Sequence, residues 1–256
     1  MNHGIFTRIA VIVLAPLLIL FASGCQGDSS SSITETPVSP TPAPPTELPT
    51  SSIDRSTITV PQGEPPVIDG TISPGEWDSA SVETFSDGSE LLLVNSEGYL
   101  YVGIRAKGPE MITGNVFINR GNQIAVLHSS AALGTALYEE GIESWQQTQA
   151  FDWCCRMTGK GEAARAERDD FLMEEHWVTT NARTGSPNEH EYQIEVGHES
   201  LRLAVNYIKV SEPNSKIPFP KDLDDDCIKP TPGGLPEQLH FVPDKWAVIS
   251  LIDSGG

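Results

Sequence analysis

Cysteines are the most reactive side chains in the expected folded part of the chain. Cys154 and Cys155 are adjacent, and Cys227 follows much later. In an exported protein, which the N-terminus indicates, disulfide bonds form and persist. We therefore expect Cys227 to bond Cys155, or Cys154 in its place, while a bond between the two neighbours is the alternative. Neither CxxC nor CxxCH occurs, which argues against redox catalysis and against an attached c-type haem.

Three aspartates alternate in a short acidic segment, at Asp222, Asp224 and Asp226. The spacing resembles the start of an EF-hand calcium loop, in which alternate carboxylates bind the ion. However, Cys227 stands where the turn glycine belongs, and Gly233 where the bidentate glutamate belongs. The segment is therefore predicted to be a solvated acidic loop, with calcium binding at the three aspartates as the alternative.

Motifs of the common hydrolases and nucleotide-binding enzymes do not occur in the sequence. His176, His190 and His198 lie near glutamates, but no pair has the HExxH spacing of a zinc hydrolase. GxSxG and P-loop motifs are also absent. With 35 Asp and Glu residues, carboxylate pairs suited to glycoside hydrolysis would arise by chance. We expect a protein that is not an enzyme and has no catalytic residues.

Aromatic side chains gather in the segment Ala136–Arg156. The segment lacks a clean two-residue period and is predicted to be rich in loops. Exposed rings can stack on the C–H faces of sugars, while neighbouring polar groups donate or accept hydrogen bonds. The alternative is that the rings cover one end of the folded domain. The predicted ligand-binding residues are Tyr138, Trp145, Trp153 and Arg156, with Phe151 in the same aromatic group.

The N-terminus has the composition of an export signal. Arg8 precedes the apolar run Ile9–Phe21, which is too short for a bilayer core of about 30 Å and fits a signal peptide. Small residues then lead to Cys25, a pattern that resembles the bacterial lipobox, in which the cysteine is acylated and residues 1–24 are removed. An ordinary secretory signal with a chance cysteine is the alternative. We expect Cys25 to anchor the protein in the cell envelope, on the extracytoplasmic side of the membrane.

Composition separates a tether from a folded domain. Residues 28–52 contain 7 Ser, 5 Thr and 6 Pro, too little apolar surface to offset the entropy of ordering. Residues 25–59 are thus predicted to form a disordered tether, and residues 60–256 a single domain. Lys and Arg total 16 against 35 Asp and Glu, for a formal charge of −19. Such a field repels phosphate backbones, which argues against nucleic-acid partners and is compatible with calcium or sugars.

The domain has the pattern of a β protein. A hydrophobic content of 38% with 22 Gly and 20 Pro argues against a helical bundle. Apolar and polar residues alternate in segments separated by turns, and only Glu162–Asp170 is predicted to be helical. The fold class predicted is all-β, an antiparallel β-sandwich with few short helices. The expected strand pairs are Leu91–Val94 with Tyr99–Ala106, Val116–Asn119 with Gln123–His128, and Trp177–Ala182 with Glu191–Val196; Ala204–Val210 and Trp246–Ile252 are further strands.

Two short patterns are open to structural interpretation. In Glu191–Val196, Tyr192 and Ile194 point to one side and Glu191 to the other, typical of a strand with one buried face. Ser73-Pro74-Gly75-Glu76 has a capping-box arrangement for one helical turn, on which Trp77 is expected to pack into the core rather than contact a ligand.

The order of these motifs resembles a known family. Val67-Ile68-Asp69-Gly70, then Gly75-Glu76-Trp77 and a hairpin ending Tyr99-Leu100-Tyr101-Val102, look like the start of a family 9 carbohydrate-binding module or a DOMON-like relative. The pattern Glu191–Val196, a Pro-rich loop and Trp246 before the last strand is similar too. The resemblance spans roughly residues 60–252. It implies a β-sandwich that binds sugars, in some members near calcium, while some relatives bind haem.

Three functional hypotheses follow from this resemblance and from the tether. The first is a lipid-anchored, non-catalytic module that binds carbohydrate. The second is a structural or protein-interaction lipoprotein without a small ligand, since a stable scaffold serves both roles. The third is a haem-binding module, for which Met111, Met157, Met173 and His128 are the candidate axial ligands.

Overall fold

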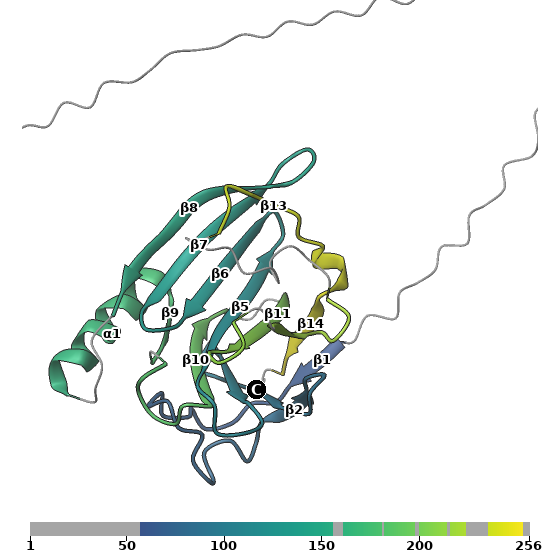
Figure 1. Cartoon of the computed structure of the whole chain (residues 1–256). Coiled ribbons are helices and arrows are strands. Elements are labelled where there is room, and N and C mark those ends of the chain that lie inside the picture. Colours follow the sequence, from purple (N-terminus) through teal and green to yellow (C-terminus); the bar gives the residue numbers. More distant parts are fainter. Residues whose placement is uncertain are drawn as a thin grey trace, which may run out of the picture. The chain divides into compact units, whose positions relative to one another are not determined.

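The domain is a β-sandwich of two sheets, as predicted (Figure 1). The computed structural model describes residues 57–155, 161–180, 182–197, 200–213, 216–223 and 235–252. The signal segment, most of the predicted tether and Cys25 lie outside these ranges. Strand β1 (Thr57–Val60) begins within the segment predicted to be tether.

The larger sheet has nine strands in the order β1-β14-β11-β5-β6-β7-β8-β13, with β12 paired to β11. All neighbours are antiparallel except β1 and β14, which run parallel. The strands from β5 to β8 lie side by side in Figure 1. Their bounds are β5 Ile112–Arg120, β6 Gln123–Ser129, β7 Leu133–Glu140, β8 Trp145–Cys154, β11 Leu201–Lys209, β12 Lys216–Phe219, β13 Gln238–Leu239 and β14 Ala247–Leu251.

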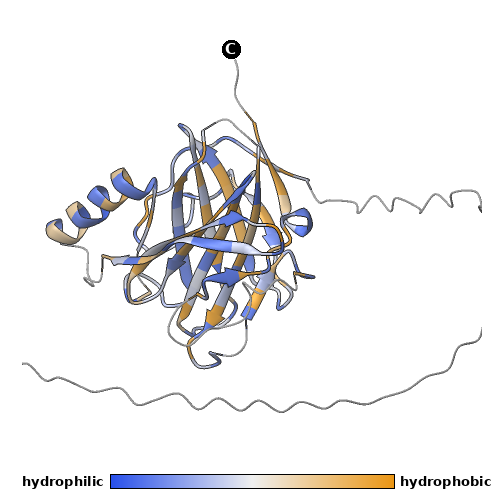
Figure 2. Cartoon of the chain, turned by 90° about the horizontal axis from the view of Figure 1, so that it is seen from above, coloured by the Kyte–Doolittle hydropathy of each residue, from blue (hydrophilic) through white to orange (hydrophobic). Residues whose placement is uncertain are grey.

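The smaller sheet has five antiparallel strands in the order β2-β3-β4-β10-β9. The bounds are β2 Ser81–Thr84, β3 Glu90–Ser96, β4 Tyr99–Arg105, β9 Trp177–Thr179 and β10 Glu189–Glu195. Helix α1 (Glu162–Glu175) precedes β9, and the short 3-10 helix η2 (Pro243–Lys245) precedes β14. Figure 2 shows α1 as a largely hydrophilic helix, of which only Ala164 and Phe171 are buried.

Three apolar clusters hold these layers together. The main core lies between the sheets and contains the alternate apolar residues of both, such as Leu93, Val102, Val116 and Val205. A second cluster covers part of the outer face of the large sheet, where Phe241 and Trp246 pack on Phe117. A third covers the outer face of the small sheet and contains Trp77. Both faces of each sheet are therefore partly buried.

The strands and turns predicted from the two-residue period are confirmed, except that the strand expected over Trp177–Ala182 ends at Thr179. β3 and β4 form a hairpin around Glu97 and Gly98, and both turn residues have positive φ. β5 pairs with β6, and β9 with β10, in the predicted antiparallel sense. The helix begins where expected, at Glu162, and continues to Glu175. No helix in the described ranges has the length and apolar character needed to cross a bilayer.

The segment Ala136–Arg156, predicted to be rich in loops, is instead mostly a long hairpin. β7 and β8 are antiparallel partners, joined by a turn that contains the fully exposed Ile142. The register shifts twice between Thr135 and Tyr138, where bulges interrupt the pairing. A bulge changes which side chains share a face. This explains why the sequence shows no clean period of two.

Candidate ligand-binding face

The predicted ligand-binding residues separate into buried and exposed positions. Tyr138 is fully buried and Trp145 is 6% exposed, and both belong to the cluster on the outer face of the large sheet. Tyr138 also donates its hydroxyl to the carbonyl of Pro236. Because neither ring offers a face to solvent, their assignment as ligand contacts is corrected to core packing. Trp153, in contrast, is 38% exposed, and Arg156 lies outside the described residues.

Trp153 belongs to a row of side chains that crosses the outer face of the large sheet. The register places Trp153 of β8 opposite Gly134 of β7, and Gly134 opposite His128 of β6. His128 pairs with Asn115 of β5, and Asn115 with Asn206 of β11. Directly paired residues project to the same face of a sheet. We name this set the outer row.

Alternation along the strands fixes which face the outer row occupies. His128 lies two residues from Val126, and Asn115 two residues from Phe117; both apolar residues belong to the outer cluster. Residues two apart on a strand point the same way. The outer row therefore lies on the same sheet face as the outer apolar cluster, directly beside it, and consists of polar and aromatic side chains.

A directed chain of hydrogen bonds connects three members of the row. Asn115 donates through Nδ2 to Oδ1 of Asn206 at 2.7 Å, which leaves its own Oδ1 as an acceptor. His128 Nδ1 lies 2.6 Å from that oxygen and must donate the proton. Nε2 of the neutral ring is then an acceptor, and it has no hydrogen-bond partner among the described residues.

Burial keeps the His128 ring neutral. Removal from water, assisted by the charges of His190 and Lys216, lowers the pKa of His128 to about 4. At neutral pH the side chain is thus a fixed acceptor at Nε2 rather than a cation. An acceptor held in place by its other ring nitrogen is suited to a ligand hydroxyl.

Aromatic rings form the end of the row at β8. Phe151 and Trp153 are stacked, with ring centroids 4.8 Å apart and planes inclined by 28°. Both rings also contact His128, at centroid distances of 5.6 and 5.4 Å. A Cβ atom on Gly134 would lie 3.0 Å from both aromatic rings, so a glycine allows them to lie close to strand β7. The outcome is a partly exposed aromatic surface beside a polar row.

Asn206 ends the row at β11 with an unsatisfied donor. Its side chain is fully buried, and Nδ2 has no partner among the described residues. A buried donor without an acceptor costs about 1–3 kcal/mol. A buried water that accepted this hydrogen bond would recover that free energy.

The motif that carries the family resemblance has a structural role. Glu191 is fully buried on β10, in contrast to the solvent-facing position expected from its strand pattern. Oε2 accepts hydrogen bonds from the backbone amides of Asp69, Gly70 and Thr71, and Oε1 accepts one from Nε1 of Trp77. Burial raises the pKa of Glu191 to about 7, although these donors favour the charged form.

This carboxylate attaches the loop at residues 67–77 to the small sheet. Gly70 has φ +83°, a conformation that few L-residues adopt without strain, and its amide makes the shortest of the four bonds, at 2.8 Å. Trp77 is 5% exposed, which confirms its predicted packing in the core. The side chain of Glu76 accepts a hydrogen bond from the amide of Ser73, as expected of a capping box. With its oxygens occupied, Glu191 has a structural role.

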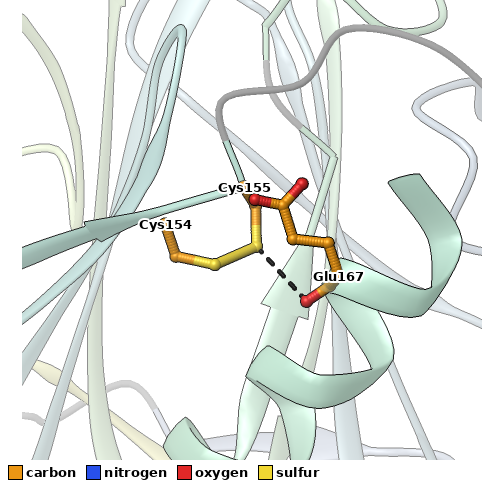
Figure 3. Close-up of side chains that lie close together, drawn as sticks. All are labelled: Cys154, Cys155 and Glu167. Carbon is orange, nitrogen blue, oxygen red and sulfur yellow. Dashed lines mark hydrogen bonds between the residues drawn. A yellow bond between two sulfur atoms is a disulfide. The ribbon is translucent and has the colours of Figure 1, made fainter. Parts of the chain in front are cut away.

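The structure joins Cys154 to Cys155, the alternative named above, rather than either to Cys227, which lies outside the described residues. The bridge ends β8, and Sγ of Cys155 contacts the carbonyl of Glu167 on α1 at 3.6 Å (Figure 3). The same three residues are the one potential metal-ligand group in the described ranges. Thiolates are the cysteine form that binds metals, so the bridged state does not suit a metal ion.

The predicted calcium segment is only partly described. Asp222 is exposed to solvent, whereas Asp224 and Asp226 lie outside the described residues. Calcium binding by these aspartates stays a prediction.

Comparisons with known proteins give no relative from which a function could be transferred. No protein-family model, no curated protein and no solved structure matches the chain. The resemblance to family 9 carbohydrate-binding modules and DOMON-like domains therefore stays a prediction.

The sequence contains a local signal for part of the outer row. His128 follows Val126 and Ile124 at the spacing of one strand face, and Asn206 follows Ala204 in the same way. On adjacent strands, polar residues at the end of an otherwise apolar face indicate that this part of the face either binds a ligand or is not covered by the apolar cluster. Strand pairing was required to align Asn115, His128 and Trp153.

Proposed function

We propose that the domain is a non-catalytic carbohydrate-binding module whose ligand lies on the outer row. The observation that carries this proposal is the partly exposed aromatic pair of Phe151 and Trp153 beside the free Nε2 acceptor of His128. A pyranose ring presents apolar C–H faces and hydroxyl groups around its rim. The aromatic surface can stack on the C–H faces, and the His128 acceptor can bind a hydroxyl group.

The composition of the row favours binding over hydrolysis. Glycoside hydrolysis requires two carboxyl groups on either side of the glycosidic bond. Asn206, Asn115, His128, Gly134 and Trp153 include no carboxyl group, so the row lacks the pair of carboxyls on which this chemistry depends.

Trp153→Ala is expected to weaken retention of the protein on polysaccharide affinity gels about tenfold. Loss of an aromatic contact of this kind corresponds to about 1.4 kcal/mol. The indole is 38% exposed, so its removal should change the thermal midpoint little. Ile142→Ala is the matched control, because Ile142 is a fully exposed apolar residue in the β7–β8 turn.

The hydrogen-bonding part of the site has its own variant. His128→Phe keeps a ring of similar size but removes the Nε2 acceptor, and it should weaken retention without removing the aromatic surface. Wild-type protein that is retained by no polysaccharide in a panel of soluble and insoluble glycans would reject the proposal. Equal retention of Trp153→Ala and Ile142→Ala would remove the outer row as the binding face.

We also propose that Cys25 anchors the protein to the extracytoplasmic side of the membrane. Support comes from the small residues that precede Cys25 and from the apolar segment Ile9–Phe21, which is too short to remain as a spanning helix. Cys25→Ala is expected to release the protein into the soluble fraction or to leave the precursor uncleaved, measured by detergent partitioning and mass. A variant that is cleaved and still partitions like wild type would contradict lipid anchoring.

A further inference from the structure

A cleft opens on the inner side of the large sheet, where the small sheet ends. β9 is the edge strand of the small sheet and has three residues, whereas β7 and β8 of the large sheet have eight and ten. The inner faces of β5 to β8 therefore extend past β9, and the C-terminus of α1 forms the other wall. The cleft has a volume of about 260 Å³. That is slightly below the range of about 300–1,000 Å³ for drug-sized ligands, so it suits a small metabolite.

Its floor is apolar. Leu127 and Trp177 line this floor but are only 3% and 1% exposed, so its accessible apolar surface comes from Ala125 on β6 and Leu137 on β7. Nε1 of Trp177 donates to Oγ1 of Thr135 at 2.7 Å, so the buried indole needs no hydrogen-bond partner from the cleft. Leu137 is only partly buried, which means that apolar surface remains exposed to water here. An apolar group that covered this floor would be stabilised by removal of that surface from water.

One wall of the cleft is negative. Glu174 and Glu175 lie in the last turn of α1, and neither forms an ion pair or hydrogen bond within the described ranges. The last turn contains no basic residue, so the partial negative charge of the helix C-terminus adds to the two carboxylates. Together they favour a cationic group such as an ammonium ion.

A guanidinium group also lines the cleft. Arg120 ends β5 and donates one hydrogen bond from Nη2 to the carbonyl of Glu195. It has no carboxylate partner among the described residues. A guanidinium fixed by a carbonyl retains other N–H donors, which suit a ligand carboxylate. The cleft thus combines partly exposed apolar side chains with lining groups of opposite charge.

We propose that this cleft binds a free α-amino acid with an apolar side chain. The ammonium group lies against Glu174 and Glu175, the carboxylate against Arg120, and the side chain on Ala125 and Leu137. This site is separate from the outer row, because its lining residues Leu127 and Thr135 alternate with His128 and Gly134 on their strands. The inference does not depend on carbohydrate binding.

Isothermal titration of the purified protein with L-phenylalanine tests the proposal. Two analogues dissect the charges: phenethylamine lacks the carboxylate, and 3-phenylpropanoate lacks the ammonium group. We expect L-phenylalanine to bind and each analogue to bind at least about tenfold more weakly, which is about 1.4 kcal/mol per lost ionic contact.

Charge variants assign each contact. Arg120→Gln should abolish the preference for L-phenylalanine over phenethylamine, and Glu174→Gln with Glu175→Gln should abolish the preference over 3-phenylpropanoate. Trp153→Ala should leave amino-acid binding unchanged, which distinguishes failure here from failure of the carbohydrate proposal. No heat of binding with L-phenylalanine or L-leucine at millimolar concentration, or equal affinity for all three phenyl compounds, overturns the inference.

Discussion

Replacement of Glu191 by leucine is expected to lower the free energy of unfolding by about 4 kcal/mol. The substitution leaves the amides of Asp69, Gly70 and Thr71 and the indole of Trp77 without their common acceptor. Each buried donor left unpaired costs about 1–3 kcal/mol, and the costs are not fully additive. Urea denaturation followed by tryptophan fluorescence measures the change.

Two matched variants separate the loss of an acceptor from other effects. Glu191→Gln retains one oxygen but brings an amide donor toward the remaining N–H groups, so we expect an intermediate loss of about 2 kcal/mol. Glu195→Gln changes an exposed glutamate on the same strand and should alter stability by no more than about 0.5 kcal/mol. If Glu191→Leu is as stable as Glu195→Gln, the carboxylate does not hold the loop to the sheet.

The sequence predicted those parts of the fold that a local pattern determines. In β3, β4 and β10, the alternation is regular and the turns contain residues that tolerate positive φ, such as Gly98 and Gly185. The side-chain period fixes both the secondary structure and the buried face of such strands. The helix that begins at Glu162 interrupts this alternation, so the local pattern predicts it as well.

Prediction failed where both faces of a sheet are covered. The second apolar cluster buries Tyr138 and Trp145 against Phe241, a residue about a hundred positions later. Contacts of this kind are set by tertiary packing, and the local sequence carries no trace of them. Tyr138 and Trp145, predicted to contact a ligand, are buried because the C-terminal segment with Phe241 covers the outer face of the large sheet.

The buried polar groups show the same limit. Glu191 reads as a solvent-facing residue, yet four donors from a segment more than a hundred residues away surround it. His190 precedes it on β10 and is fully buried in the main core, with Nε2 donating to the carbonyl of Ile112 at 3.1 Å. Partners so distant in sequence cannot be assigned before the strands are paired.

These buried groups predict how stability depends on pH. Burial lowers the pKa of His190 to about 4, as it does for His128, from an ordinary value of 6.5. Between pH 6.5 and pH 4 the unfolded chain therefore binds protons that the folded protein does not, and the free energy of unfolding falls as pH falls. Glu191 acts in the opposite sense, because its pKa in the folded protein is about 7, above the ordinary value of 4.5. Between these two values the folded protein holds a proton that the unfolded chain has lost, so the free energy of unfolding rises as pH falls.

The wild-type protein is therefore expected to lose on the order of 3 kcal/mol of stability between pH 7 and pH 4, the effect of two histidines opposed by one glutamate. A pKa difference of one corresponds to about 1.4 kcal/mol, so each of the three groups contributes on the order of 3 kcal/mol. His190→Gln keeps a donor for the carbonyl of Ile112 but does not titrate, so the loss should nearly vanish. Glu191→Gln removes the opposing group and should roughly double it.

Urea midpoints measured from pH 7.5 to pH 4 for the three proteins test the signs independently of any ligand. The intercepts at neutral pH report the structural cost of each substitution, whereas the slopes report the protons taken up on unfolding. A steeper slope for His190→Gln than for wild type, or a shallower one for Glu191→Gln, would contradict the assignment. Nε2 of His128 stays an acceptor down to the pKa of His128, which is about 4. Carbohydrate retention should therefore persist down to this pH wherever the domain is still folded, even though its stability has fallen.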